Sequence, residues 1–142
     1  MDSTRFTTAI TRKPATSYAD GQSSGRYGSP DLEKAVAQHD AYCSALTGCG
    51  VRTIVLEPDD RFPDSTFVED AAVVLPDAAV IMRPGHPSRL GEIEDIREVL
   101  SVYRETVDIP EGARIDGGDV LQADQDFFVG LSGRTDEPGA RA

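Results

Sequence analysis

Residues 68–82, VEDAAVVLPDAAVIM, contain two apolar segments that flank a Pro-Asp turn and directly follow the acidic pair Glu69 and Asp70. Two short apolar segments joined by such a turn predict a β-hairpin, with arms at about 70–75 and 79–83. Acidic side chains are normally solvated, yet these two stand directly before a segment with the composition of a buried one. Their position therefore needs an explanation.

The same pattern recurs 47 residues later, in IDGGDVLQADQDFFV (115–129). The two stretches align without a gap, so that Glu69 aligns with Asp116 and the turn residue Asp77 aligns with Asp124. The second stretch predicts another hairpin, with arms DVLQA and DFFVGL. A repeat of 40–50 residues that carries a small sheet is typical of blades around a common centre. Coincidental similarity between two hairpins is the alternative.

The rest of the chain supplies helices and further strands of a mixed α/β fold. We expect strands at 6–12, 51–56 and 106–109, helices at 29–47 and 92–104, and the start of a third helix near the C-terminal PGARA. Ser29 is the expected N-cap of the first helix, with Pro30 in its first turn. The polar, glycine-rich residues 13–29 predict a flexible, lid-like loop.

Both long helices have an apolar face at helical spacing. The face of the first is predicted to contain Leu32, Ala35, Val36, His39, Cys43 and Leu46, and that of the second Ile93, Ile96, Leu100 and Tyr103. His39 and Cys43 are therefore interpreted as packing residues rather than as a catalytic pair.

The composition fits one globular domain over residues 1–142 and argues against several classes of partner. A net charge of −11, with only Lys13 and Lys34 as lysines, disfavours nucleic acid as a ligand. No segment approaches the roughly 20 apolar residues of a membrane span. With no recognisable signal peptide, we expect a cytoplasmic protein without a membrane partner. Cys43 and Cys49 lack the spacing of a metal or redox motif.

Arginines repeat together with the acids, since Arg89 follows the first hairpin and Arg134 follows the second. Equivalent corners of successive blades in a ring point to the same axis. We therefore expect the acids Glu69, Asp70 and Asp116 to converge there, with both arginines close by.

A converging cluster of acids repels itself unless something neutralises it, and three interpretations compete. Carboxylates suit Mg²⁺ or Ca²⁺, but the chain has no loop with an acid at every other position. The acids can instead cap turns and face water. The third interpretation is an organic cation, because a guanidinium with its planar set of donors pairs well with carboxylates. Arginines nearby would then bind the anionic end of an arginine-like ligand.

The order of several motifs resembles the dimethylarginine dimethylaminohydrolase family of guanidine-modifying enzymes. The motifs are FTTAITRKP (6–14), the Pro30-Asp31 and Gln38-His39 pairs, FPDSTFVEDAAVV (62–74), RPGHPSRLGE (83–92), DGGDV (116–120) and FFVGLSGRT (127–135). The resemblance covers essentially the whole chain. It implies a pentein-type five-bladed α/β-propeller, of which about two to three blades are present here, and no metal or other cofactor.

The resemblance also implies roles for individual residues. Asp64, Glu69 and Asp70 match acids that contact the guanidino and amino groups of the substrate, and Phe67 lies among them and packs on the substrate. Gln22 matches a lid position that is more often leucine and makes its contact through the backbone.

Three further residues complete the implied site. Arg89 and Arg134 match the pair that grips the substrate carboxylate, and Asp116 matches an acid that holds the guanidinium and assists the catalytic groups. Leu90 departs from relatives that often carry a second arginine at this position. The implied substrate is methylated arginine, which a cysteine thiolate attacks to give citrulline and methylamine or dimethylamine, with a histidine as general acid and base.

The family's catalytic cysteine and histidine lie further along a longer chain. His39, His86, Cys43 and Cys49 do not match them. We therefore expect this chain to represent an N-terminal half that holds substrate-recognition groups. We also expect it to expose blade edges, through which it can associate, for example as a homodimer. The alternatives are a related guanidino hydrolase, deiminase or amidinotransferase-like enzyme, and an inactive guanidino-binding fragment.

Overall fold

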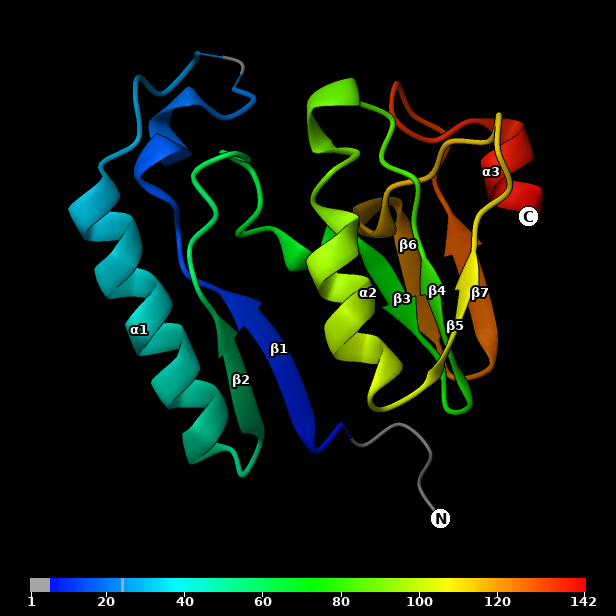
Figure 1. The fold of residues 1–142 in the computed structure, drawn as a ribbon, viewed down its shortest axis with the longest axis horizontal. Helices are drawn as coiled ribbons and strands as arrows, with labels where there is room; N and C mark the ends of the chain where they lie inside the picture. The colour runs from blue at the N-terminus through cyan, green and yellow to red at the C-terminus, as the bar shows by residue number, and fades with distance from the viewer. Residues whose placement is uncertain (1–5, 24) are drawn as a thin grey trace. The chain divides into compact units, whose positions relative to one another are not determined.

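The computed structural model describes residues 6–23 and 25–142 (Figure 1). The chain forms two compact units, Met1–Val68 and Glu69–Ala142. That residues 1–142 act as one domain stays a prediction.

The first unit is a strand–helix–strand crossover. Strands β1 (Thr8–Arg12) and β2 (Arg52–Leu56) pair in parallel, with Ile10 opposite Ile54. Helix α1 (Leu32–Gly48) connects them and packs on β2. The apolar face predicted for this helix is confirmed, since its six predicted residues are half-buried whereas the other residues of α1 are exposed.

The N-cap of α1 differs from the prediction. The cap is Asp31, whose carboxylate accepts a hydrogen bond from the Lys34 N–H at 3.0 Å, and the prediction of Ser29 was wrong. Aspartate caps as well as serine does, and it adds a negative charge at the positive end of the helix dipole. The helix ends at Gly48, and Gly50 takes a positive φ of 80° that turns the chain toward β2.

The predicted lid-like loop, residues 13–29, contains a short 3₁₀ helix, η1 (Thr16–Asp20). The rest of the loop, as far as it is described, has no regular structure, and residue 24 lies outside the described residues. The flexibility of the loop stays a prediction.

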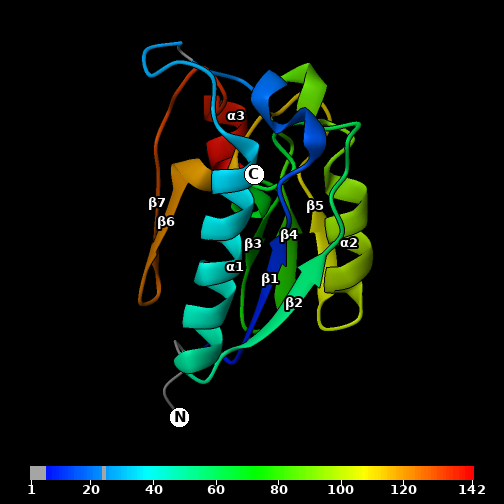
Figure 2. The ribbon, with the colours of Figure 1, turned by 90° about the vertical axis from the view of Figure 1, so that its left-hand side faces the viewer.

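The second unit contains a three-stranded mixed sheet. Strands β3 (Ala72–Val74) and β4 (Ala78–Ile81) form the predicted antiparallel hairpin, and β5 (Glu105–Asp108) pairs in parallel with β4. Helix α2 (Ile93–Ser101) makes the crossover and lies along this sheet (Figure 2).

Two of the four residues predicted for the apolar face of α2 lie in the core of this unit. Ile96 and Leu100 are buried together with Ala79 and Ile81 of β4. The prediction for Tyr103 was wrong. The helix ends at Ser101, before Tyr103, which belongs to the turn that leads into β5 and is 41% exposed.

The second predicted hairpin is also confirmed. Strands β6 (Val120–Ala123) and β7 (Asp126–Val129) pair antiparallel, and Asp124 at their turn has a positive φ of 54°. A 3₁₀ turn precedes each hairpin, η2 (Val68–Asp70) before β3 and η4 (Gly117–Asp119) before β6. The repeat in the sequence is therefore a structural repeat.

Two shorter elements complete the unit. The 3₁₀ turn η3 (Pro87–Arg89) follows β4, and α3 (Glu137–Arg141) follows β7, as the sequence predicts for a third helix. Within residues 6–23 and 25–142, no helix has the length and apolar character needed to cross a membrane.

Candidate functional site

Asp70 connects the two acidic corners of the second unit. It is the last residue of η2, where its side chain is almost completely buried. One carboxylate oxygen lies 2.5 Å from Arg89 Nη1, and the other accepts the Gly118 N–H at 3.1 Å. Both oxygens of this acid are therefore held, one by a charged partner and one by the backbone of the second corner.

Arg89 is a buried cation between two carboxylates. Its Nε and Nη2 atoms both donate to Glu92 Oε2, at 2.9 and 2.7 Å, in addition to the contact with Asp70. Burial alone would lower the pKa of Arg89, but the hydrogen bonds to Glu92 and Asp70 and the charges of these acids outweigh it and raise the pKa. The guanidinium is thus permanently charged.

Asp116 is the second buried acid, with 1% of its surface exposed. Its Oδ1 accepts the Gly85 N–H at 3.0 Å. Its Oδ2 accepts no hydrogen bond within the described part of the chain, although Arg134 Nε lies 3.3 Å away. Burial raises the pKa of Asp116 against the opposing effects of the Gly85 N–H and the charge of Arg134, while Asp70 adds to the increase.

Arg134 differs from Arg89 in its surroundings. Its side chain is 48% exposed, whereas that of Arg89 is 5% exposed. A half-exposed guanidinium beside a buried carboxylate has both the charge and the access needed to meet an anionic group of a ligand.

The corners of the two repeats lie against each other, as the repeat predicts. A Cβ atom at Gly117 would lie 2.0 Å from the carbonyl oxygen of Glu69, so the backbones touch at this point. Four of the predicted residues, Asp70, Arg89, Asp116 and Arg134, therefore belong to one cluster within the second unit. Glu69 contributes its backbone to this contact, and the residue is exposed.

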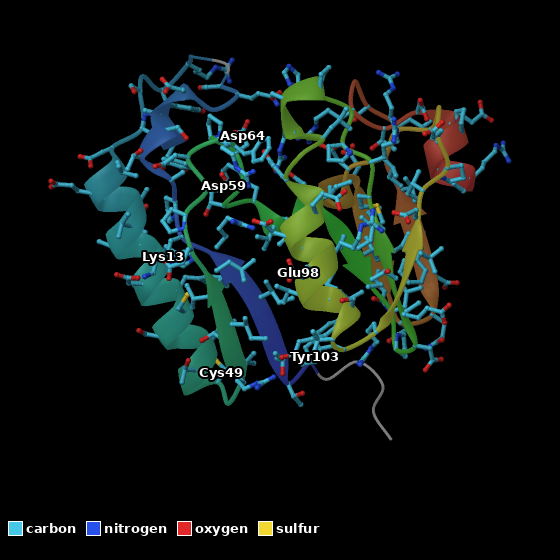
Figure 3. The ribbon with its side chains drawn as sticks, viewed as in Figure 1. Lys13, Cys49, Asp59, Asp64, Glu98 and Tyr103 are labelled. Atoms are coloured by element: carbon cyan, nitrogen blue, oxygen red, sulfur yellow. The ribbon has the colours of Figure 1, made fainter. Side chains whose placement is uncertain are left out.

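The other three predicted residues belong to the first unit. Asp64 is buried, and both of its carboxylate oxygens accept the backbone N–H of Gln22, at 3.1 and 3.2 Å. The ring of Phe67 lies 6.3 Å from that of Tyr18 in η1 and remains 39% exposed. Figure 3 shows Asp64 on the loop after β2, beside η1. Asp64 thus ties the lid-like loop to the FPDSTF segment.

Sequence reasoning missed Glu92, although it is buried and holds Arg89. The signal was its spacing, because an acid three residues after an arginine is within reach on a helical turn. It also missed Asp119, Ser132 and Thr135, which are hydrogen-bonded to one another near Asp116. Within residues 6–23 and 25–142, no group of three or more His, Cys, Asp and Glu side chains has the arrangement to hold a metal ion.

Comparison with known proteins explains this arrangement of repeats, buried acids and arginines. A solved structure of a cysteine-to-serine mutant of the Pseudomonas aeruginosa dimethylarginine dimethylaminohydrolase, in complex with citrulline, superposes with a TM-score of 0.93 at 41% identity, over 96% of this chain and 54% of that chain. The fold is therefore the predicted pentein-type α/β fold of guanidine-modifying enzymes, present here in part.

The family follows from the sequence comparisons. The family model described as "N,N dimethylarginine dimethylhydrolase, eukaryotic" matches residues 11–142. The Pseudomonas aeruginosa N(G),N(G)-dimethylarginine dimethylaminohydrolase is 41% identical over 96% of this chain, and that of Streptomyces coelicolor is 37% identical over 94%. The chain belongs to the dimethylarginine dimethylaminohydrolase family. It spans about half the length of these relatives, 54% and 52% respectively.

Proposed function

We propose that this chain forms the substrate-recognition part of an enzyme that hydrolyses N-omega-methylated arginine to citrulline and methylamine or dimethylamine. The match of the family model over residues 11–142 carries this proposal. The citrulline held by the mutant relative of similar fold supports a small guanidino or ureido amino acid as the ligand.

Recognition of the cationic end is assigned to buried carboxylates. Asp116 presents an oxygen that accepts no hydrogen bond in the described part of the chain, and it is flanked by the charge of Asp70. A guanidinium N–H is a suitable donor to such an oxygen, because the bond is charge-assisted on both sides. Asp64, Glu69 and Phe67 are assigned to the same ligand by their match to the family motif, as is the backbone of Gln22.

Recognition of the anionic end is assigned to the arginines. Arg134 has the exposure to meet a carboxylate directly, and Arg89 is assigned the second contact by its motif. Since Arg89 is already neutralised by Asp70 and Glu92, we assign the larger share of carboxylate binding to Arg134. In this proposal Arg89 chiefly fixes the position of Asp70.

In the proposed reaction, a thiolate and an imidazole carry out the covalent step. In the proposed reaction the thiolate attacks the guanidino carbon, the imidazole protonates the leaving amine, and the same imidazole activates water to release citrulline. Asp116 supports this step by holding the carbon in line with the thiolate. We expect neither Cys43 nor Cys49 to be this nucleophile, since neither matches the family's catalytic cysteine, which lies further along a longer chain.

The proposal is tested by ligand binding to the 142-residue chain and by turnover in a chimera. Binding of dimethylarginine, citrulline and lysine is measured by NMR titration, and the first two are expected to bind more tightly than lysine. The chimera joins residues 1–142 to the remaining segment of the Pseudomonas aeruginosa relative, and it is expected to release citrulline from dimethylarginine.

The outcomes separate the alternatives. Citrulline formation from arginine but not from dimethylarginine would favour a deiminase. Specific binding together with a folded but inactive chimera would favour a guanidino-binding protein without catalysis. Failure of both measurements would overturn the proposal. We further propose a cytoplasmic location, with which the free thiols of Cys43 and Cys49 are compatible.

A further inference from the structure

Asp119, the second acid of the DGGD motif, accepts hydrogen bonds from two hydroxyl groups. Its Oδ2 receives the Ser132 hydroxyl at 2.8 Å and the Thr135 hydroxyl at 2.6 Å. Both donors belong to the Ser-Gly-Arg-Thr segment after β7, so Asp119 joins the start of the second hairpin to the segment that follows it. Neither the family motif nor the proposed reaction assigns a role to this acid.

The two hydroxyls in turn accept hydrogen bonds from the backbone of the candidate site. Thr135 Oγ1 accepts the Asp116 N–H at 3.1 Å. Ser132 Oγ accepts the Arg134 N–H at 3.0 Å. Because a hydroxyl has one proton, its donation to Asp119 leaves the oxygen lone pairs directed at these N–H groups. The carboxylate therefore determines which way both hydroxyls point.

Backbone contacts close this network. The Ser132 N–H donates to the Thr135 carbonyl at 3.0 Å, and the Asp119 N–H donates to the Asp116 carbonyl at 3.0 Å. Thr135 is 1% exposed, so its hydroxyl is shielded from water. A shielded hydroxyl that lost its acceptor would be free to turn its proton toward the Asp116 N–H and break that bond.

The charge of Asp119 is maintained at neutral pH. Burial would raise the pKa of this carboxyl, but the hydroxyls of Thr135 and Ser132 and the charge of Arg134 outweigh burial and lower the pKa. An ionised carboxylate is an acceptor only, which removes any ambiguity in the direction of the two hydroxyl bonds.

We propose that Asp119 is a positioning residue, which holds the backbones of Asp116 and Arg134 in fixed relation through Thr135 and Ser132. The two residues held in this way are the acid and the arginine that lie 3.3 Å apart in the candidate site. The inference rests on the proposed function for its ligand, but the hydrogen-bond network itself does not depend on that function.

The test uses the 142-residue chain and substitutions at Thr135 and Asp119. Thr135→Val keeps the shape and removes the hydroxyl, Thr135→Ser keeps the hydroxyl, and Asp119→Asn removes the charge. Ile96→Val is the control, because it weakens the core at α2 and does not touch the network. Amide hydrogen exchange of Asp116 and Arg134 and the affinity for dimethylarginine are measured by NMR.

We expect Asp119→Asn to speed exchange at both amides, Thr135→Val to speed exchange at the Asp116 amide, and both substitutions to weaken ligand binding about tenfold. Thr135→Ser, which keeps the hydroxyl, is expected to show wild-type amide exchange and wild-type ligand affinity. Ile96→Val is expected to leave binding unchanged. Wild-type exchange in Thr135→Val and Asp119→Asn would overturn the proposal, as would wild-type affinity in both. If the wild-type chain bound no ligand, the proposed function would fail, and the exchange and rescue measurements would still decide the role of Asp119.

Discussion

Arg89 and Glu92 form a buried ion pair in which two guanidinium nitrogens, Nε and Nη2, donate to a single carboxylate oxygen at 2.9 and 2.7 Å. Each of the two side chains is 5% exposed. Removing one member of a buried pair leaves the other charge without full compensation, which is far more costly than losing a surface pair. Glu92 therefore determines whether Arg89 can remain buried next to Asp70.

Glu92→Ala is expected to lower the free energy of unfolding by about 3 kcal/mol, because the buried Arg89 loses one of its two carboxylate partners. Urea denaturation followed by circular dichroism measures the change. Glu94→Ala is the matched control, since the side chain of Glu94 is 68% exposed in its pair with Arg97. The control is expected to change stability by less than about 0.5 kcal/mol. Equal losses in the two variants would contradict the structural role of Glu92.

The two arginines are expected to respond differently to substitution. Arg134→Ala should weaken dimethylarginine binding by about 2 kcal/mol, through loss of a charge-assisted contact, and should destabilise the fold less than Arg89→Ala, because Arg134 is half-exposed and lies beside one buried carboxylate rather than two. Arg89→Ala should weaken binding and also destabilise the fold, because Asp70 and Glu92 remain buried without their cation. Isothermal titration and urea denaturation separate the two effects. Unchanged affinity in Arg134→Ala would refute its assignment to the substrate carboxylate.

Asp116 predicts a specific dependence of stability on pH. Burial raises its folded-state pKa above the ordinary value of 3.8, so the folded chain retains this proton to a higher pH than the unfolded chain does. The stability contributed by the group is therefore present below 3.8 and is lost as the pH rises through the folded pKa.

Asp116→Asn removes this titration. The variant is expected to gain stability relative to the wild type as the pH rises through the folded-state pKa of Asp116, and to lose ligand affinity. Urea denaturation over a pH series measures the difference. Asp126→Asn on the exposed strand β7 is the control for the loss of an aspartate elsewhere in the same unit. A difference that is constant with pH would contradict the raised pKa of Asp116.

Local patterns in the sequence predicted the elements well. The apolar spacing in α1 identified the six half-buried residues of that helix, and the Pro-Asp and Asp-Gln turns located both hairpins. Periodicity succeeds in α1 because one face of this helix packs on β2. The helix ends were less certain. Ser29 and Asp31 are both good caps, and no Gly or Pro marks the end of α2 before Tyr103.

The cluster of charges was predicted only in part. The repeat indicated that Glu69, Asp70 and Asp116 converge, because the acids before the two hairpins occupy equivalent corners. The partners that hold them were not predictable, since Thr135 bonds to Asp116 across 19 residues and to Asp119 across 16. Such contacts depend on how a loop folds back on the hairpin, which no local pattern in the sequence records.

The β6–β7 hairpin predicts self-association. Leu121 and Phe128 lie opposite each other on one face and are 63% and 59% exposed. Adjacent exposed apolar side chains favour contact with another surface. Leu121→Thr with Phe128→Thr is therefore expected to reduce concentration-dependent association in sedimentation velocity. Val102→Thr, which replaces a 77% exposed side chain after α2, is the control and should leave association unchanged. A purely monomeric wild-type chain would contradict the prediction.

Gly117 allows the closest approach between the two repeats. A Cβ atom at this position would lie 2.0 Å from the Glu69 carbonyl oxygen, which is part of the backbone and cannot move aside as a side chain would. Gly117→Ala is therefore expected to separate the corners, to cost about 2 kcal/mol of stability and to disturb the hydrogen bond between Gly118 and Asp70. Gly133→Ala is the matched control, because a Cβ there would meet nothing within 4 Å.

The two alanine variants compare a methyl group that meets backbone atoms with one that meets nothing within 4 Å. Urea denaturation measures the loss of stability, and the amide chemical shift of Gly118 reports on its bond to Asp70. Gly133→Ala is expected to stay within about 0.5 kcal/mol of the wild type. If Gly117→Ala were as stable as Gly133→Ala and kept the wild-type shift of Gly118, the corners could not be packed as closely as the structure has them. The convergence of Asp70 and Asp116 would then need another explanation.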